Sequence, residues 1–600
     1  MAKNIVLLSD GTGNSASSVQ KTNIWRLYRA LDLTADDQIA IYDDGVGTGS
    51  FRPLAVAGQA FGLGLARNVR DLFTFLSRNY VPGDRVYAFG FSRGSFTIRM
   101  LVGMVRHKGL VDRSLPEDKF QKEVLRRWAD YRKRFERRKL RYTLGRGKDE
   151  RMEKRTTLTT SKADQEGLVP DFEFVGLWDT VDAYGLPIDE LMYGIDLWIY
   201  PVSFADRRLT RHVKAAYHAL SVDDERRTFH PVLWDEIAEG TDPDIPADRL
   251  KQVWFPGVHA NVGGGYAKDG LALVSLEWML TAPELKTLKL HQIHVDEIRR
   301  QVDIYDDLID SRAGLAGYYR YAPRNISALC HDEFAEVEIA RPKIHESVFR
   351  RVKGHHVAYA PPGIPAEYDV VLRDGTIVKW EDRASAPAAQ QCFETDDAAK
   401  LRAERMEAAW NVIWWRRVVY FLTLGSSAFL AALPWLTSSI GVSAVLPRIS
   451  GRLTALITPV LDIAATVLPG FVATKWFGAF KQEPILFLIG AAAVAGTMAL
   501  GMNLKLRIEC RAGQVWANRY EGGVVPAWAS EAIKTWFFRF RTKPMLVAWY
   551  KAFAREILPT IAIFGTILLL LWAASTDWRI AVALAVVAVV IGMRNIVLRL

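Results

Sequence analysis

Short apolar runs alternate with amphipathic segments along the first 400 residues of the chain. Strand patterns lie at residues 3–8, 39–42 and 85–89, and helical apolar spacing lies at 63–80 and 96–105. Strands that alternate with helices are typical of a mostly parallel sheet covered on both faces. This pattern predicts a doubly wound α/β domain over residues 1–370.

The pattern changes after about residue 410, where long apolar stretches replace the alternation. About 20 apolar residues cross the hydrocarbon core of a bilayer as a helix. Four stretches fit this length and are the predicted spans: 418–436, 484–504, 557–575 and 580–598. Core helices of a soluble domain are the alternative, but such helices carry a polar stripe. The sequence therefore predicts a linker with an amphipathic helix over 371–410 and an all-α transmembrane region over 411–600.

Basic residues beside the spans suggest an orientation. Arg416, Arg417 and Lys505 lie at one end of the first two spans, which places this end in the cytoplasm by the positive-inside rule. We therefore predict a multi-pass protein of a bacterial inner (cytoplasmic) membrane whose N-terminal α/β domain faces the cytoplasm. Arg448 and Lys481, in the connection between these spans, oppose this orientation. Residues 453–473 are apolar but broken by prolines, which predicts a re-entrant, interfacial or loop segment.

The charge balance adds a class of partner. Lys+Arg outnumber Asp+Glu by 77 to 67, which gives a formal charge of +10 and suits an anionic partner such as a membrane surface. Basic residues interleaved with aromatic ones are concentrated between Glu117 and Arg155, where we expect a helical insertion over about 117–160. This insertion is either a solvated helix or an element that touches anionic lipid. No fold that binds nucleic acid accompanies it.

The three cysteines are far apart, so neither a disulfide framework nor a cysteine-based zinc site is expected. The N-terminus runs directly into a strand pattern and lacks the layout of a signal peptide. We therefore expect the α/β domain to stay in a reducing compartment. The sequence predicts no metal and no cofactor, and it does not indicate an oligomeric state.

The sharpest motif is Gly90-Phe91-Ser92-Arg93-Gly94, which lies between a strand pattern and a helix pattern. It fits G-x-S-x-G, in which a strained turn exposes the serine Oγ and flanking glycines let strand and helix approach. Ser92 is therefore the candidate nucleophile. The alternative is a tight turn whose serine only caps the helix.

A serine nucleophile needs a base and an orienting carboxylate, which follow it in the order Asp or Glu, then His. Asp179 comes directly after a strand pattern, and His259 follows another strand pattern and precedes a glycine run. They are the candidate acid and base. The competing acids are Asp182, Asp223 and Asp224, and His218, His230, His345, His355 and His356 lack the strand-then-glycine context.

An oxyanion hole requires backbone N–H donors near the serine. Arg93, at the start of the predicted helix, can supply one, and Gly11 or Thr12, after the first strand, can supply a second. The alternative for the loop around Gly11 is a phosphate-binding loop, but it lacks both the Walker spacing and the G-x-G-x-x-G spacing.

The segments LSDGTGN, YDDGVGTG, YAFGFSRGSFTIRM, FVGLWDTVDAYG and WFPGVHANVGGGY occur in this order. As an ordered set they resemble the α/β-hydrolase family that includes the catalytic domain of type VI secretion phospholipase effectors. The resemblance implies an α/β-hydrolase-like fold and a lipid esterase in which Ser92, Asp179 and His259 form the triad. It also implies Ser-Asp after the histidine, where this chain has Ala260-Asn261.

These observations predict a membrane-anchored serine hydrolase of lipid esters, with phospholipid as the favoured substrate and an anionic membrane surface as partner. One alternative is a degenerate hydrolase fold that serves as a sensor or scaffold, and Ala260-Asn261 is its only hint. A transporter or channel is less favoured, because the predicted spans contain few charges.

Overall fold

The structure is a computed structural model of the 600-residue chain. It describes residues 2–11, 19–45, 63–143, 168–181, 208–239, 246, 248–332, 337–354, 358–437, 442–466, 473–517 and 543–545. All statements below concern these residues.

A nine-stranded sheet forms the centre of the α/β region, in the order β11-β10-β9-β6-β5-β4-β3-β1-β2. The strands are β1 Asn4–Ser9, β2 Gln38–Asp43, β3 Arg85–Phe91, β4 Phe172–Trp178, β5 Val213–Ser221, β6 Leu250–Phe255, β9 Lys343–His345, β10 Asp369–Val371 and β11 Ile377–Val378. Every pairing is parallel except that of β10 with β11. The predicted mostly parallel α/β fold is therefore confirmed.

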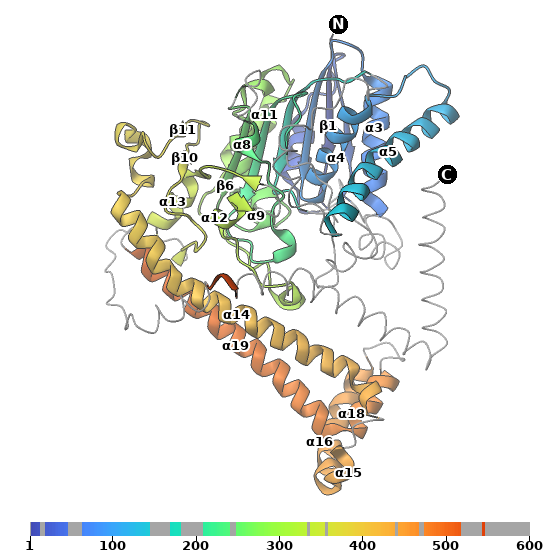
Figure 1. Ribbon diagram of the computed structural model, residues 1–600, viewed down its shortest axis with the longest axis vertical. Helices are drawn as coiled ribbons and strands as arrows, with labels where there is room; N and C mark the ends of the chain where they lie inside the picture. The colour runs from blue at the N-terminus through green and yellow to red at the C-terminus, as the bar shows by residue number, and fades with distance from the viewer. Residues whose placement is uncertain are drawn as a thin grey trace.

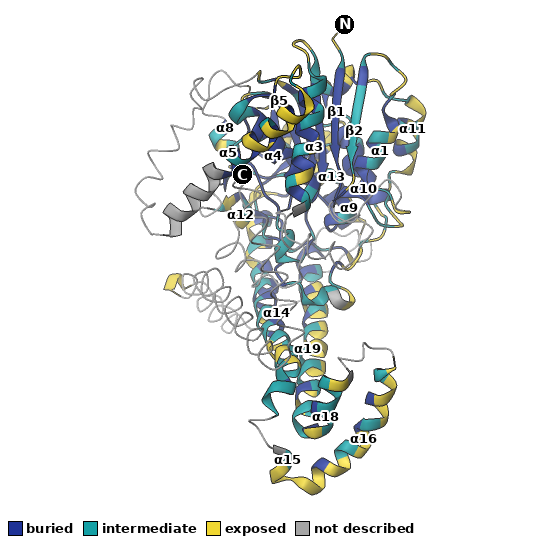
Figure 2. Ribbon diagram, turned by 90° about the vertical axis from the view of Figure 1, so that its right-hand side faces the viewer, coloured by how far each residue is buried: buried dark blue, intermediate teal, exposed yellow. Residues whose placement is uncertain are grey.

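Helices cover both faces of this sheet (Figure 1). One face packs against α3 Leu63–Asn79, α4 Arg93–Lys108 and α5 Glu117–Thr143, and the other against α1 Asn23–Ala30, α10 Gly270–Met279 and α11 Gln292–Gln301. Alternate strand residues feed the two cores: Ile5 and Leu7 of β1 join the first, and Val6 and Leu8 join the second. The inner strands are buried on both sides, whereas β2 at the edge is half-buried, as Figure 2 shows. Such burial explains their continuous apolar runs.

The sheet continues beyond the boundary predicted at residue 370. That boundary falls inside β10, which pairs with β9, and β11 adds one further strand. A third core surrounds these strands and includes Tyr368, Trp380 and Cys392. Residues 371–392, predicted as a linker, therefore contribute a strand and core side chains to the α/β region.

Two long helices lead away from the sheet: α14 Asp396–Leu436 and α19 Pro484–Trp516. They run side by side over much of their length (Figure 1). Their connection contains α15 Val442–Val445, α16 Pro447–Ala465, η9 Ala473–Phe477 and α18 Gly478–Gln482. Most of the predicted 453–473 segment is thus helical, with Pro459 inside α16.

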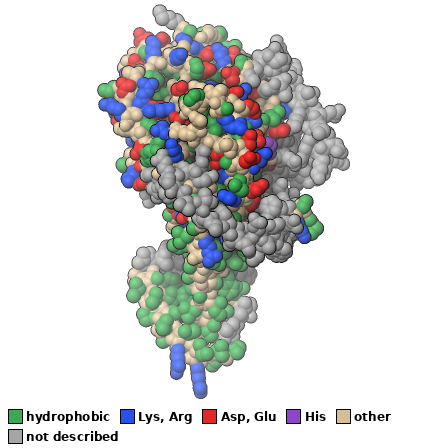
Figure 3. Space-filling view, turned by 90° about the vertical axis from the view of Figure 1, so that its left-hand side faces the viewer, with side chains coloured by type: hydrophobic (Ala, Val, Ile, Leu, Met, Phe, Trp, Pro, Cys, Tyr) green, Lys and Arg blue, Asp and Glu red, His purple; other side chains and the backbone are tan. Residues whose placement is uncertain are grey.

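Among the described residues, two helices are long and apolar enough to cross a membrane, the one that ends at Leu436 and α19. They contain the predicted spans 418–436 and 484–504. The predicted spans 557–575 and 580–598 lie outside the described residues, so a four-span topology and its orientation stay predictions. Figure 3 shows hydrophobic side chains gathered at the end of the molecule that holds α16 and α18, whereas charged side chains are spread over the α/β region.

The remaining described elements are short. They are α8 Glu236–Glu239, α9 His259–Gly263, α12 Ile326–Cys330, α13 Glu346–Lys353, the β7 His331–Asp332 and β8 Val337–Glu338 hairpin, and the 3₁₀ turns η3 Arg227–Phe229, η4 Pro283–Thr287, η5 Gly314–Tyr318, η7 Arg383–Ser385 and η8 Pro387–Cys392. Among them, α9, η3 and the chain after η5 supply residues to the candidate site.

Candidate active site

Ser92 occupies the turn between β3 and α4 in a backbone conformation that is unusual for a non-glycine residue. Its φ is +58° and its ψ is −122°. A Cβ on Gly90 would lie 2.6 Å from the Ser95 Cα, and one on Gly94 would lie 2.1 Å from the Ser9 carbonyl oxygen. Glycine at these two positions therefore lets β3, α4 and β1 approach closely enough to form the turn.

The Ser92 hydroxyl does not cap the helix that follows it. Its Oγ lies 2.7 Å from Nε2 of His259, within hydrogen-bonding distance. The alternative, in which Ser92 only caps the helix, therefore does not describe this turn. Strain held at a turn that carries a polar side chain is typical of functional sites.

His259 begins α9, directly after β6 and its following turn. Its Nδ1 lies 2.6 Å from Oδ2 of Asp179, so the imidazole bridges the serine and the aspartate. Phe91 stacks on the ring with a centroid separation of 4.8 Å, and Phe229 meets it edge-on at 4.9 Å. These two aromatic side chains fix the plane of the imidazole.

Asp179 follows β4 and also has a positive φ, +41°. Its carboxylate accepts hydrogen bonds from the Ser221 N–H at 3.0 Å and from the Ser221 hydroxyl at 3.3 Å. The side chain is fully buried. Ser92, Asp179 and His259, which the sequence places far apart, thus form one hydrogen-bonded chain.

Two of the competing acids have other partners. Asp224 accepts from the backbone N–H of His259 at 3.1 Å, and it pairs with Arg226 at 2.7 Å. Asp223 accepts from the Gly257 N–H at 2.7 Å and from the Tyr359 hydroxyl at 2.8 Å. Both therefore hold the backbone around the histidine. Asp182 lies outside the described residues.

Arg324 is a component of the site that the sequence did not suggest. Its guanidinium binds both carboxylate oxygens of Asp179, at 2.7 and 2.8 Å, and neither side chain is exposed. It also donates to the backbone carbonyls of Ser221 and Phe229. The pair is 145 residues apart in sequence, and no local pattern around Arg324 marks it.

The backbone donors for an oxyanion differ from expectation in one respect. The Gly11 N–H donates to its neighbour Asp10, 2.6 Å from Oδ1, so this amide is not free in the structure. Thr12 lies outside the described residues. Arg93 is the first residue of α4, where backbone N–H groups lack an acceptor within the helix.

Asn261 stands where the family resemblance implies an aspartate. Its Oδ1 accepts from the N–H groups of Val258 at 3.3 Å and Ile309 at 3.4 Å, and its Nδ2 donates to the Asp307 carbonyl at 3.1 Å. These bonds hold the loop that carries His259. The departure from the family pattern therefore acts on the loop backbone and not on the imidazole.

Electrostatics keep the base neutral and the acid ionised. Burial lowers the pKa of His259, and the hydrogen bond to Asp179 partly opposes this shift. Burial alone would raise the pKa of Asp179, but Arg324 and His259 more than offset it, so this pKa is lowered. At neutral pH the site therefore holds an unprotonated imidazole against a carboxylate, which is the state a general base requires.

The pKa of His259 leads to a pH prediction. With a water-soluble ester, kcat/KM should rise with pH along a single acidic limb whose midpoint lies below the usual histidine value of 6.5, because burial disfavours the imidazolium. A pH-rate profile in detergent measures it. A midpoint clearly above 6.5 would show that Asp179 outweighs burial and would contradict this reading.

Removal of Arg324 should destabilise the protein. Arg324→Met leaves the buried Asp179 carboxylate without its cation, which typically costs about 3–5 kcal/mol in the free energy of unfolding. Urea unfolding in detergent, followed by tryptophan fluorescence, measures the loss. Arg113→Met, at an exposed site, is the matched control and should change stability little. Equal stabilities for the two variants would contradict the importance of the pair.

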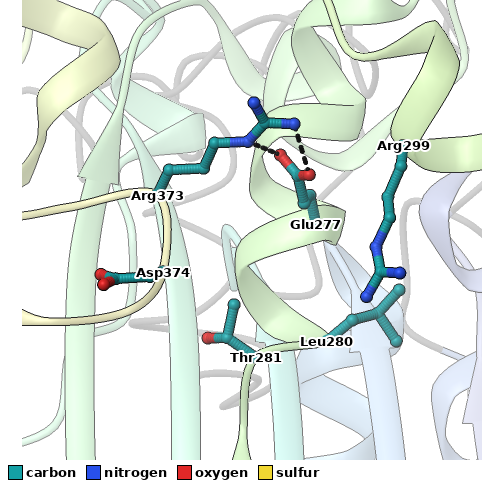
Figure 4. A pocket seen from close by; sticks show the side chains of 6 residues that line it. All are labelled: Glu277, Leu280, Thr281, Arg299, Arg373 and Asp374. Atoms are coloured by element: carbon teal, nitrogen blue, oxygen red, sulfur yellow. Dashed lines mark hydrogen bonds and ion pairs between the residues drawn. The ribbon is translucent and has the colours of Figure 1, made fainter.

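A separate surface pocket of about 330 Å³ is lined by Glu277, Leu280, Thr281, Arg299, Arg373 and Asp374 (Figure 4). Arg373 forms two hydrogen bonds with Glu277 across it. Ser92, Asp179 and His259 do not line this pocket, so it is distinct from the candidate active site.

A comparison with models of protein families finds a match to the α/β region. The family model for the T6SS, Phospholipase effector Tle1-like, catalytic domain matches residues 3–282. The family resemblance is confirmed. The match spans slightly under half of the chain and includes Ser92, Asp179 and His259, whereas Arg324 lies beyond its end. It indicates a hydrolase that acts on lipid esters.

Two further similarities are weaker. The uncharacterized protein YEL023C of Saccharomyces cerevisiae is 29% identical over 245 residues, which is 38% of this chain and 32% of that protein. The chain thus spans about a third of the length of this relative. An uncharacterized protein from Pseudomonas aeruginosa, known from a crystal structure, aligns with 82% of this chain and 66% of its own at 14% identity. Its TM-score is 0.26, and no argument rests on it.

Proposed function

We propose that this protein is a membrane-anchored serine hydrolase that cleaves the carboxylic esters of phospholipids. The observation that carries the proposal is the hydrogen-bonded chain from Ser92 Oγ through His259 to Asp179. The match to a phospholipase catalytic domain supports the class of substrate.

The mechanism assigns one role to each side chain of the triad. Ser92 Oγ attacks the ester carbonyl while His259 Nε2 accepts its proton, and the imidazolium then protonates the leaving alcohol. Asp179 holds Nδ1–H, which fixes the tautomer and stabilises the imidazolium. Water, activated by the same imidazole, releases the fatty acid from Ser92. The Arg93 N–H, at the positive end of α4, donates to the oxyanion.

Contacts between the long helices and the α/β region support the anchor. Arg416 of α14 pairs with Glu225 at 3.2 Å, and Lys505 of α19 pairs with Asp310 at 2.5 Å. These pairs lie just before the charge-free stretch of α14 and just after that of α19. Few side chains in the two apolar windows are buried, which favours membrane spans over core helices.

Helix α14 also approaches the site. The Tyr318 hydroxyl lies 3.0 Å from the Ser427 hydroxyl of α14. The next residue, Tyr319, packs edge-on against Phe229, and Phe229 packs against the ring of His259. The aromatic side chains beside His259 are therefore linked to the proposed span in α14 through Tyr318. This proximity favours a substrate drawn from the bilayer over a soluble ester.

Fatty-acid release from phospholipid vesicles that contain the reconstituted full-length protein tests the proposal. Wild-type protein should release free fatty acid and leave a lysophospholipid. Release of a phosphorylated headgroup instead would indicate cleavage of a phosphate ester and would contradict the proposal, as would the absence of any hydrolysis by folded protein.

A further inference from the structure

Arg93, the residue after the candidate nucleophile, has a side chain that the protein itself does not satisfy. Its Nη1 is buried and has no hydrogen-bond partner among the described residues, although the residue as a whole is half-buried. Buried polar groups in folded proteins nearly always have partners, and buried charges are nearly always paired. A buried guanidinium nitrogen without a partner, on the residue that follows the nucleophile, therefore calls for an explanation.

Other arginines in the described part of the chain are satisfied differently. Arg324 binds Asp179, and Arg226 binds Asp224. Arg351 has two unpartnered nitrogens, but its third nitrogen, Nη1, donates to backbone carbonyls, and Nη1 of Arg99 also donates to a backbone carbonyl. Arg93 has neither kind of partner within the described residues. Arg85 shares this feature, but it begins β3, at the end of the strand opposite to Ser92.

The charge of Arg93 lies near Tyr319, one of the aromatic residues close to His259. Burial lowers the pKa of Arg93 to about 10, and interaction with Tyr319 partly offsets this, so the guanidinium is charged at neutral pH. The Tyr319 ring lies 5.6 Å from that of Phe229, which contacts the His259 ring at 4.9 Å. A cation near Tyr319, on the residue that follows Ser92, is available to an anionic group that a bound ester carries.

We propose that Arg93 is a specificity-determining residue that binds the phosphate of the lipid headgroup while Ser92 attacks the acyl ester. The inference rests on the proposed function and deepens it. In a glycerophospholipid only a few bonds separate the phosphate from the acyl ester, so adjacent residues suffice to hold both. A guanidinium presents paired N–H donors that match phosphate oxygens. A neutral acylglycerol has the same ester but no anion for Arg93.

The test compares two lipids that differ only in the headgroup phosphate ester. Dioleoylphosphatidylglycerol and dioleoylglycerol are presented at equal mole fraction in the same detergent micelles, and kcat/KM is measured for full-length wild type, Arg93→Met, Arg93→Lys and Arg113→Met. Fluorophosphonate labelling of Ser92 counts the active sites in each preparation, so that misfolded protein is excluded from the rates.

Arg93→Met should lower kcat/KM for phosphatidylglycerol by about 10- to 100-fold more than for dioleoylglycerol, the range expected for a lost hydrogen bond to a charged group. Arg93→Lys should recover part of this selectivity, because lysine keeps the positive charge but lacks the paired N–H donors of the guanidinium. It also serves as the deciding variant if Arg93→Met does not fold. Arg113→Met should match the wild type.

Equal losses on the two lipids would overturn the inference alone, since Arg93 would then act on the turn or the oxyanion. Wild-type protein that hydrolyses dioleoylglycerol as fast as phosphatidylglycerol would overturn it as well, while the lipid esterase stands. Hydrolysis of neither lipid by labelled wild type would overturn the proposed function and this inference together.

Discussion

Ser92→Ala is expected to reduce kcat for ester hydrolysis by about a million-fold, the loss that follows removal of a triad serine elsewhere. The reason is local: the Oγ that lies 2.7 Å from His259 Nε2 is the only atom of the proposed triad that bonds to the acyl group. Binding and backbone donors remain in the variant, so a small residual rate over water is expected.

The measurement for this variant uses a short soluble ester and a phospholipid in parallel, with protein purified in the same detergent. Ser114→Ala is the control, because Ser114 is exposed and lies in a turn before α5. It should keep wild-type activity. Retention of more than a few per cent of activity by Ser92→Ala on both substrates would assign the chemistry to another nucleophile.

Asp179→Asn is expected to reduce kcat by about ten-thousand-fold while the protein stays folded. The carboxamide has nearly the shape of the carboxylate, but its NH₂ group cannot accept the hydrogen bonds that His259 and Arg324 donate to the two oxygens. The imidazole therefore loses the acceptor for Nδ1–H and turns or adopts the other tautomer, in which Nε2 no longer accepts from Ser92.

The KM of this variant for the soluble ester should change far less than kcat, because Asp179 does not touch substrate. Asp112→Asn provides the control, since Asp112 is exposed and its carboxylate bonds to Ser114 within the same turn. A loss below about tenfold in Asp179→Asn would mean that the acid is not part of the machinery, whatever its geometry.

The turn around Ser92 and the order of the site residues could be predicted from the sequence because their signals are local. A strand, two glycines around a serine, and a helix identify the turn without tertiary information. Asp179 and His259 could be selected because each follows a strand pattern, and parallel strands bring their carboxyl ends to one edge of the sheet.

Features without a recognisable local pattern in the sequence could not be predicted. Arg324 has no local signature, and only its salt bridge to Asp179 gives it a place in the site. The strands β10 and β11 have three and two residues, too short for a periodicity to be recognised. The bond from the Gly11 amide to Asp10 depends on a loop conformation that residue types do not determine.

Trapping of the acyl-enzyme tests the central claim most directly. Full-length wild-type protein is mixed with a radiolabelled phospholipid in micelles and quenched in acid within one turnover, and its peptides are then analysed by mass spectrometry. The account predicts a fatty acyl ester on Ser92, absent from His259→Ala, which lacks the general base. An acyl group on a different residue would contradict it.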